Sequence, residues 1–261
     1  MDLTKDFLSK IGRYEKEIKL KWPVIYRLKK SDPVSQAISF SKEKIHKVKV
    51  PQWALYHFDF FLPDLLHELC HCKLAETVDP LFSRIAFPEK YFSKVKENEE
   101  VSTCFNYAID SINVCMDVWV NELRNQRWPK IVLSEHRALL STLEEMIEKN
   151  KFSEMLAFET ILSIALSLAE EKKYLKTKNE PSITSIVEFL PEDLQFFILE
   201  ISEFLGSLPS LSYEKEKDLK LLEISIQELC EILRLPITPY IEKNDKEDFY
   251  LWKIKEIEEN F

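Results

Sequence analysis

Glycine is almost missing from this chain, and its scarcity limits the possible folds more than any other feature. Only Gly12 and Gly206 occur among the 261 residues. The loops that cradle phosphates in nucleotide-binding proteins need closely spaced glycines, so the sequence excludes those fingerprints. Twelve prolines serve instead as the breaks between elements. With 45% apolar and 12% aromatic residues, the chain can bury a core without disulfides.

Charge and cysteine content narrow the class of protein further. The net charge of −9 disfavours a broad surface for nucleic acid, which needs clustered lysine and arginine. The five cysteines are odd in number, which predicts reduced thiols and no disulfide framework. Residues 1–19 lack the apolar core of a secretion signal, and no apolar run approaches the length of a membrane span. We therefore expect a cytoplasmic protein with neither a membrane nor a nucleic acid as partner.

Apolar spacings of three and four residues indicate that most of the chain is helical. Residues 44–50 differ, because they alternate as a strand does, with His46 and Val48 on one face and lysines on the other. Lysine on the outer face is typical of an edge strand, and Pro51 ends this one. Residues 78–100 are expected to be loop with short helical pieces. Helices are expected at residues 3–20, 33–43, 63–77, 101–126, 134–149, 152–175, 183–205, 215–234 and 247–259.

The chain is thus predicted to be mainly α, in the α+β class, with a small sheet before the helix at residues 63–77. A boundary is expected near residue 130. The first part, residues 1–130, carries all the chemical motifs, whereas residues 131–261 show only helical packing signals.

Residues 67–71 read His-Glu-Leu-Cys-His and match the pattern H-E-x-x-H. On a helix, His67 and His71 lie one turn apart on the same face, so both can bind one zinc ion. Glu68 is rotated by about 100° and lies beside the metal, where it can take a proton from the attacking water. The alternative is a surface helix with two solvated histidines. Leucines and cysteines flank the motif on nearly every side, and buried polar side chains need partners, which favours the metal site.

A second helix carries one narrow polar strip. Between residues 105 and 121 nearly every residue is apolar except five, which recur at spacings of 4, 3, 4 and 4. At about 100° per residue they fall within an arc of roughly 80°, whereas a solvated face is wider and carries lysine or glutamate. We therefore expect the strip to face the imidazole pair and not water. Its members are Asn106, Asp110, Asn113, Asp117 and Asn121.

A catalytic zinc site needs a third protein ligand and one open position for water. The third histidine that metzincins place shortly after the motif is absent from residues 72–81. Glu76 lies five residues beyond His71 on the same helix and is poorly placed to reach back to the metal. Asp117 and Asp110 remain as candidates for the third ligand.

The run NVCMDVWVNEL, which begins at Asn113, resembles the second-helix signature of bacterial metallopeptidases related to the minigluzincins. The most similar group has its HExxH domain beside von Willebrand-type domains, and its pattern is Asn, three residues, Asp, three residues, Asn. The resemblance covers about residues 44–126. It implies a zincin-like core with Asp117 as the zinc ligand, while Asp110 stays in reserve. It also implies that Asn113 and Asn121 support the ligands or the active-site helix.

These features predict a zinc-dependent hydrolase, most simply a peptidase that acts on a peptide or protein with Glu68 as the general base. Hydrolysis of a non-peptide substrate at the same site is a weaker alternative. Another is a catalytically silent, zincin-like module for binding or regulation. Residues 131–261 are expected to wall the cleft, dock a protein partner or keep the enzyme latent. The chain departs from the family in a longer segment between the motifs and in Cys70 and Cys72, whose thiolates can compete for the metal.

Some supporting features have two interpretations. The strand at residues 44–50 is either an ordinary edge strand or one that pairs with an extended peptide substrate. His136 can stabilise an oxyanion, but is more simply a surface histidine at the start of a helix. Tyr107 and Arg124 can do similar work, and nothing in the sequence selects among them.

Overall fold

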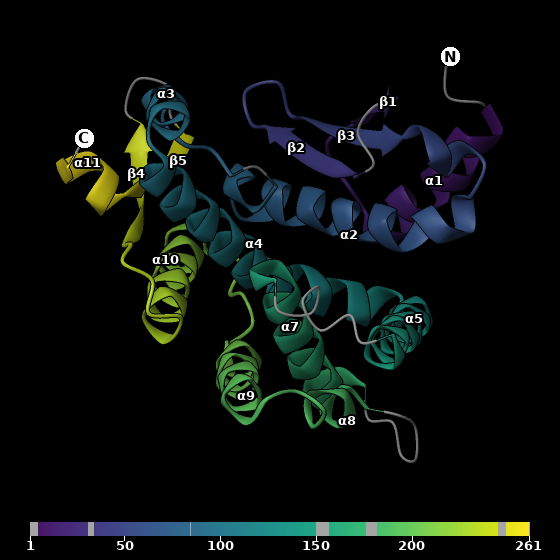
Figure 1. Cartoon of the computed structure of the whole chain (residues 1–261). Coiled ribbons are helices and arrows are strands. Elements are labelled where there is room, and N and C mark those ends of the chain that lie inside the picture. Colours follow the sequence, from purple (N-terminus) through teal and green to yellow (C-terminus); the bar gives the residue numbers. More distant parts are fainter. Residues whose placement is uncertain are drawn as a thin grey trace. The chain divides into compact units, whose positions relative to one another are not determined.

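The computed structural model describes residues 5–30, 34–83, 85–149, 157–175, 182–244 and 249–260. The predicted class is confirmed, since the chain is mainly helical with a few strands (Figure 1). Within the described ranges, no helix combines the length and apolar character that a membrane span requires. The chain forms two compact units. Unit 1 comprises residues 1–88, 211–220 and 241–252, and unit 2 comprises residues 89–210, 221–240 and 253–261.

Unit 1 is built on a three-stranded sheet in the order β1-β3-β2, with β1 parallel and β2 antiparallel to β3. The helix expected at residues 33–43 is wrong, because residues 36–40 form β2 and none of the other described residues of this stretch is helical. Ala37 and Ser39 are buried at the alternating spacing of a strand. The Ser-Asp-Pro signal that predicts the helix lies outside the described residues. The strands are β1 (Val24–Lys29), β2 (Gln36–Phe40) and β3 (Ile45–Pro51).

The strand expected at residues 44–50 is confirmed as β3, but its expected place at an edge is wrong. β3 is the middle strand, so both of its edges pair with neighbours and it cannot pair with a substrate peptide. The alternation itself is correct, since His46 and Val48 are buried. The lysines lie on the more open face of β3. There, Lys49 Nζ donates to Oε1 of Gln36 in the neighbouring strand β2 at 2.6 Å.

Helix α2 covers one face of this sheet (Figure 1). Cys72 of α2 packs against Ala37 and Val48 at the centre of the layer. α2 begins at Phe58, ahead of the expected start, so Pro63 lies inside the helix and not in its first turn. The helical elements of this layer are α1 (Lys5–Ile18), η1 (Gln52–Leu55), α2 (Phe58–Thr77) and η2 (Pro80–Phe82).

Unit 2 is a helical assembly around α4, which has 29 residues and is about 43 Å long. The side chain of Asn98 caps its N-terminus by accepting two backbone N–H groups. α7 packs against α4, α8 and α9. The boundary expected near residue 130 falls inside this unit. That the chemistry lies before this residue and only helical packing after it stays a prediction. The helices are α3 (Glu89–Glu97), α4 (Glu99–Arg127), α5 (Pro129–Glu148), α7 (Phe158–Tyr174), α8 (Ile183–Val187) and α9 (Glu192–Ser207).

The expected helices at residues 101–126, 134–149 and 215–234 are confirmed, and the one at 152–175 is confirmed from residue 158 onward. Residues 152–156 lie outside the described ranges. The single helix expected at 183–205 is two helices, α8 and α9, with Pro191 between them.

The helix expected at residues 247–259 is wrong for its first half. FYLWKI forms β5, which pairs with β4, and a helix follows only from Lys255. Residues 247 and 248 lie outside the described ranges. The remaining elements are α10 (Lys215–Ile232), β4 (Pro239–Asn244), β5 (Phe249–Ile254) and α11 (Lys255–Asn260).

Candidate metal centre

The two histidines of the HELCH motif lie on α2 with their rings close together. Nε2 of His67 lies 3.1 Å from Nε2 of His71, and the ring planes meet at 74°. Two nitrogens bound to one zinc ion at tetrahedral angles are about 3.4 Å apart, given bonds of about 2.0–2.1 Å. The imidazole pair therefore already has close to the spacing that a shared zinc ion requires.

A backbone carbonyl fixes the ring of His71. Its Nδ1 lies 2.5 Å from the carbonyl oxygen of Phe82 in η2. A carbonyl oxygen only accepts, so Nδ1 carries the proton and Nε2 keeps its lone pair for a metal. The carboxylate of Asp79 holds η2 in place, because it accepts the N–H of Leu81 at 2.9 Å and pairs with Lys215 at 2.8 Å.

Glu68 turns from α2 toward β2. Its Oε2 accepts the backbone N–H of Ala37 at 2.5 Å, and its Oε1 accepts the hydroxyl of Ser35 at 3.4 Å. A carboxylate offers about four lone-pair sites, so these two contacts orient it and leave sites for a water molecule. The residue expected to act as the base is thus held by two donors from outside its own helix.

The polar strip of α4, in unit 2, is only partly buried. Asp110 and Asp117 are half-buried and Asn121 is buried, whereas Asn106 and Asn113 are exposed. The expectation that the whole strip avoids water is therefore wrong. Asp117, the expected ligand, lies in the more buried half of the strip.

Beside this strip, α4 and α7 border a hollow of about 350 Å³. Its carboxyl groups belong to Asp110, Asp117 and Glu159. Burial, and then the charge of Glu159, raise the pKa of Asp110 to about 6. A carboxyl group must lose its proton before it binds a metal, so this raised pKa disfavours Asp110 as a ligand below neutral pH.

One ligand atom from each of His67, His71 and Asp117 lies within 4.8 Å of the other two. Among the residues that the structure describes, this is the one group of three or more metal-binding side chains, and Asp110 is not in it. Two histidines and one carboxylate are a donor set that catalytic zinc sites use, with the fourth position open.

The cysteine of the motif and the one directly after it lie in the core. Cys70 and Cys72 are fully buried. Burial, and then the charge of Glu68, raise the pKa of Cys72 well above its usual range, so it stays a protonated thiol. Cys72 packs against Ala37 and Val48, so its thiol belongs to the core between α2 and the sheet.

The residues considered for oxyanion stabilisation have partners within unit 2. His136 is buried, with Nε2 at 3.0 Å from the Glu171 carboxylate, so its expected place on the surface is wrong. Arg124 pairs with Glu135 at 2.8 Å. The ring of Tyr107 packs against an aromatic ring of α7, with centroids 4.9 Å apart. These contacts account for the position of each side chain, and a role in oxyanion stabilisation stays a prediction for all three.

Sequence reasoning missed the groups that orient the two motif residues. The Asp79-Pro80 pair is a readable signal, because an acidic cap followed by proline often starts a helical turn. The N–H of Ala37 and the carbonyl of Phe82 belong to the backbone and leave no trace in the sequence.

Comparison with known proteins adds no relative. No family model, curated protein or solved structure matches the chain. The resemblance to minigluzincin-related peptidases therefore rests on the HELCH motif of α2 and the polar strip of α4, and the function has to be argued from these residues themselves.

Proposed function

We propose that the protein is a zinc-dependent hydrolase, most simply a metallopeptidase, with His67, His71 and Asp117 as ligands and Glu68 as general base. The observation that carries this proposal is the 3.1 Å separation of the two imidazole Nε2 atoms. The carbonyl of Phe82 supports it, because it leaves the His71 lone pair facing that gap. The proximity of an Asp117 oxygen supports the third ligand.

His67, His71 and Asp117 would hold the zinc ion, which would lower the pKa of the attacking water toward neutrality and polarise the substrate carbonyl. Glu68 takes a proton from the attacking water while the water oxygen bonds to the carbonyl carbon. As the C–N bond breaks, Glu68 passes this proton to the departing amine. Ser35 and the N–H of Ala37 hold the Glu68 carboxylate in one orientation through this sequence.

The proposal differs from the sequence-based hypothesis in where a substrate lies. β3 is internal, so the strand expected to pair with a peptide has no open edge. β2 is the outer strand next to Glu68, and its N–H groups at Ala37 and Ser39 bond to the side chains of Glu68 and Ser83. A peptide therefore meets a strand edge whose donors are already used, and side-chain contacts carry more of its recognition.

Metal analysis of the untagged, full-length protein tests the ligand set. We expect about one zinc per chain in the wild type and in Glu68→Gln, and loss of zinc in His67→Ala and Asp117→Ala. Asn106→Ala is the matched control, because it removes an exposed side chain from the same strip. Iron in place of zinc contradicts the metal assignment, since two histidines and a carboxylate also suit non-haem iron.

Cleavage of a peptide mixture, followed by mass spectrometry, tests the reaction. Glu68→Gln should lower the rate by about 10²–10⁴-fold while zinc stays bound, because only the proton transfer is lost. A wild type that holds zinc but cleaves no peptide, before or after limited proteolysis, contradicts the peptidase. That result instead favours the silent binding module.

A further inference from the structure

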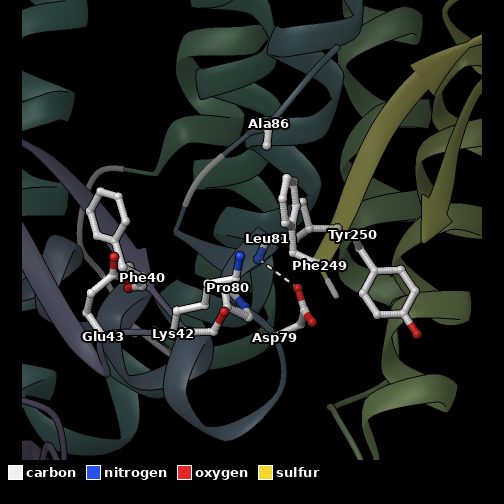
Figure 2. Close-up of a pocket in the computed structure, with 11 residues that line it drawn as sticks. Phe40, Lys42, Glu43, Asp79, Pro80, Leu81, Ala86, Phe249 and Tyr250 are labelled. Atoms are coloured by element: carbon white, nitrogen blue, oxygen red, sulfur yellow. Dashed lines mark hydrogen bonds between the residues drawn. The ribbon is translucent and has the colours of Figure 1, made fainter. Parts of the chain in front are cut away.

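Unit 1 contains a hollow of about 190 Å³ that the proposed catalytic groups do not occupy. The turn after β2, the η2 segment and β5 line it, and in Figure 2 Phe40 and Phe249 lie on opposite sides with Pro80 and Leu81 between them. Ala86 borders it from a further side. Segments far apart in the sequence thus enclose one small space.

Two walls of this hollow also contact the proposed catalytic residues. β2 carries both Ala37, whose N–H bonds to Glu68, and Phe40, which lines the hollow. η2 supplies Leu81 to the wall and the next carbonyl, from Phe82, to His71. The N–H of Ser39 donates to the hydroxyl of Ser83 at 3.0 Å and joins the two walls. The hollow is therefore part of the framework that orients the base and one metal ligand.

The size and lining of the hollow suit one apolar side chain. Pockets for whole small molecules have volumes of about 300 Å³ or more, so 190 Å³ is the size of a single side chain. Phe40, Leu81 and Phe249 offer apolar surface, which favours burial of a hydrocarbon group, and the charged side chains of Lys42 and Glu43 share the lining. Asp79 does not make this a site for a cation, because Leu81 N–H and Lys215 already engage its carboxylate.

We propose that this hollow is a specificity subsite that receives a large apolar side chain, such as Leu, Met or Phe, of the peptide substrate. The inference rests on the proposed peptidase function and adds the class of substrate. A strand rises about 3.3 Å per residue, so Ala37 and Phe40 are about 10 Å apart along β2. The selected side chain therefore lies two or three residues from the bond that is cleaved near Glu68.

Paired peptides test the subsite in the zinc-loaded, full-length protein. One peptide carries Leu at the selected position, which cleavage of a peptide mixture identifies, and the other carries Ala. Ala86→Phe fills the hollow and should lower kcat/KM for the Leu peptide by about tenfold or more, while the Ala peptide changes less than about twofold. Phe249→Ala enlarges the hollow and should shift the preference from Leu toward Trp. Zinc content and Tm report whether each variant is folded.

The outcomes separate the two proposals. A wild type that cleaves peptides without any apolar preference two or three residues from the scissile bond overturns the subsite and leaves the peptidase standing. Equal losses for the Leu and Ala peptides in folded Ala86→Phe, with no change of preference in Phe249→Ala, overturn it as well. A zinc-loaded wild type that cleaves nothing overturns both.

Discussion

Glu76 shows how single residues anchor the helix that carries the motif. Its side chain is buried, and its carboxylate accepts the N–H groups of Lys21 and Trp22 at 2.7 and 3.0 Å and the ammonium of Lys73 at 2.7 Å. Burial opposes ionisation, but these hydrogen bonds outweigh it and lower the pKa of Glu76. Glu76 is thus not expected to bind the metal, and instead it ties α2 to the segment after α1.

The lowered pKa of Glu76 predicts a pH dependence of stability. The stabilisation is complete above the ordinary value of 4.5 and is lost as pH falls through the lowered, folded-state pKa. Glu76→Gln should therefore cost about 2 kcal/mol of unfolding free energy at pH 7 and much less near pH 3. Urea unfolding at both pH values measures the difference. Exposed Glu97→Gln is the control, and an equal cost at both pH values would refute this role of the charge.

The hydroxyl of Ser35 gives a second residue-scale prediction, because it is one of the two donors that orient Glu68. Ser35→Ala should lower kcat about tenfold, since a misplaced base transfers a proton less well. KM and zinc content should stay unchanged, and Ser35→Thr should restore most of the rate. If Ser35→Ala changes KM alone, the hydroxyl contacts substrate and does not position the base.

At the scale of elements, η2 is the short turn that positions the proposed metal ligand His71. It is three residues long, yet its last carbonyl orients His71 and its leucine lines the hollow of unit 1. Asp79 caps η2 and also pairs with Lys215 of α10. The cap and the ion pair can be separated by mutation.

Asp79→Ala should weaken zinc binding by about 10–100-fold, which is the usual cost of losing support for a ligand. Lys215→Ala removes the ion pair but keeps the cap of η2, so its effect on zinc affinity should be much smaller. Competition with a chelating dye measures both affinities. Equal losses would show that the ion pair, and not the cap, places the carbonyl of Phe82.

The sequence predicts single helices and strands better than it predicts which of them lie side by side. Alternation correctly identified β3, but it reports which face is buried and not which strands lie on either side. Residues 33–43 are predicted as a helix because Ser-Asp-Pro is typical of a helix start, while the long-range pairing that makes residues 36–40 a strand has no local signal. At the site, side-chain spacing pointed to His67 and His71, whereas the backbone donors and acceptors around them had no signal.

For the whole molecule, a bound zinc ion adds stability because it binds the folded chain and not the unfolded one. Free zinc at a hundred times Kd contributes about 2.7 kcal/mol, which is roughly 5–10 °C in Tm for a chain of this size. We expect a chelator to lower the Tm of wild type and of Glu68→Gln by the same amount, and to leave Asp117→Ala unchanged. A chelator effect that persists in Asp117→Ala would contradict the ligand set.

X-ray absorption at the zinc edge tests the central claim most directly, since it reports the atoms bound to the metal. For the zinc-loaded wild type we predict only nitrogen and oxygen neighbours at about 2.0–2.2 Å, with the scattering of two imidazoles. Asp117→Ala should lose one oxygen neighbour or lose the metal. Sulfur scattering at about 2.3 Å, or a spectrum that Asp117→Ala leaves unchanged, would contradict a centre built from His67, His71 and Asp117.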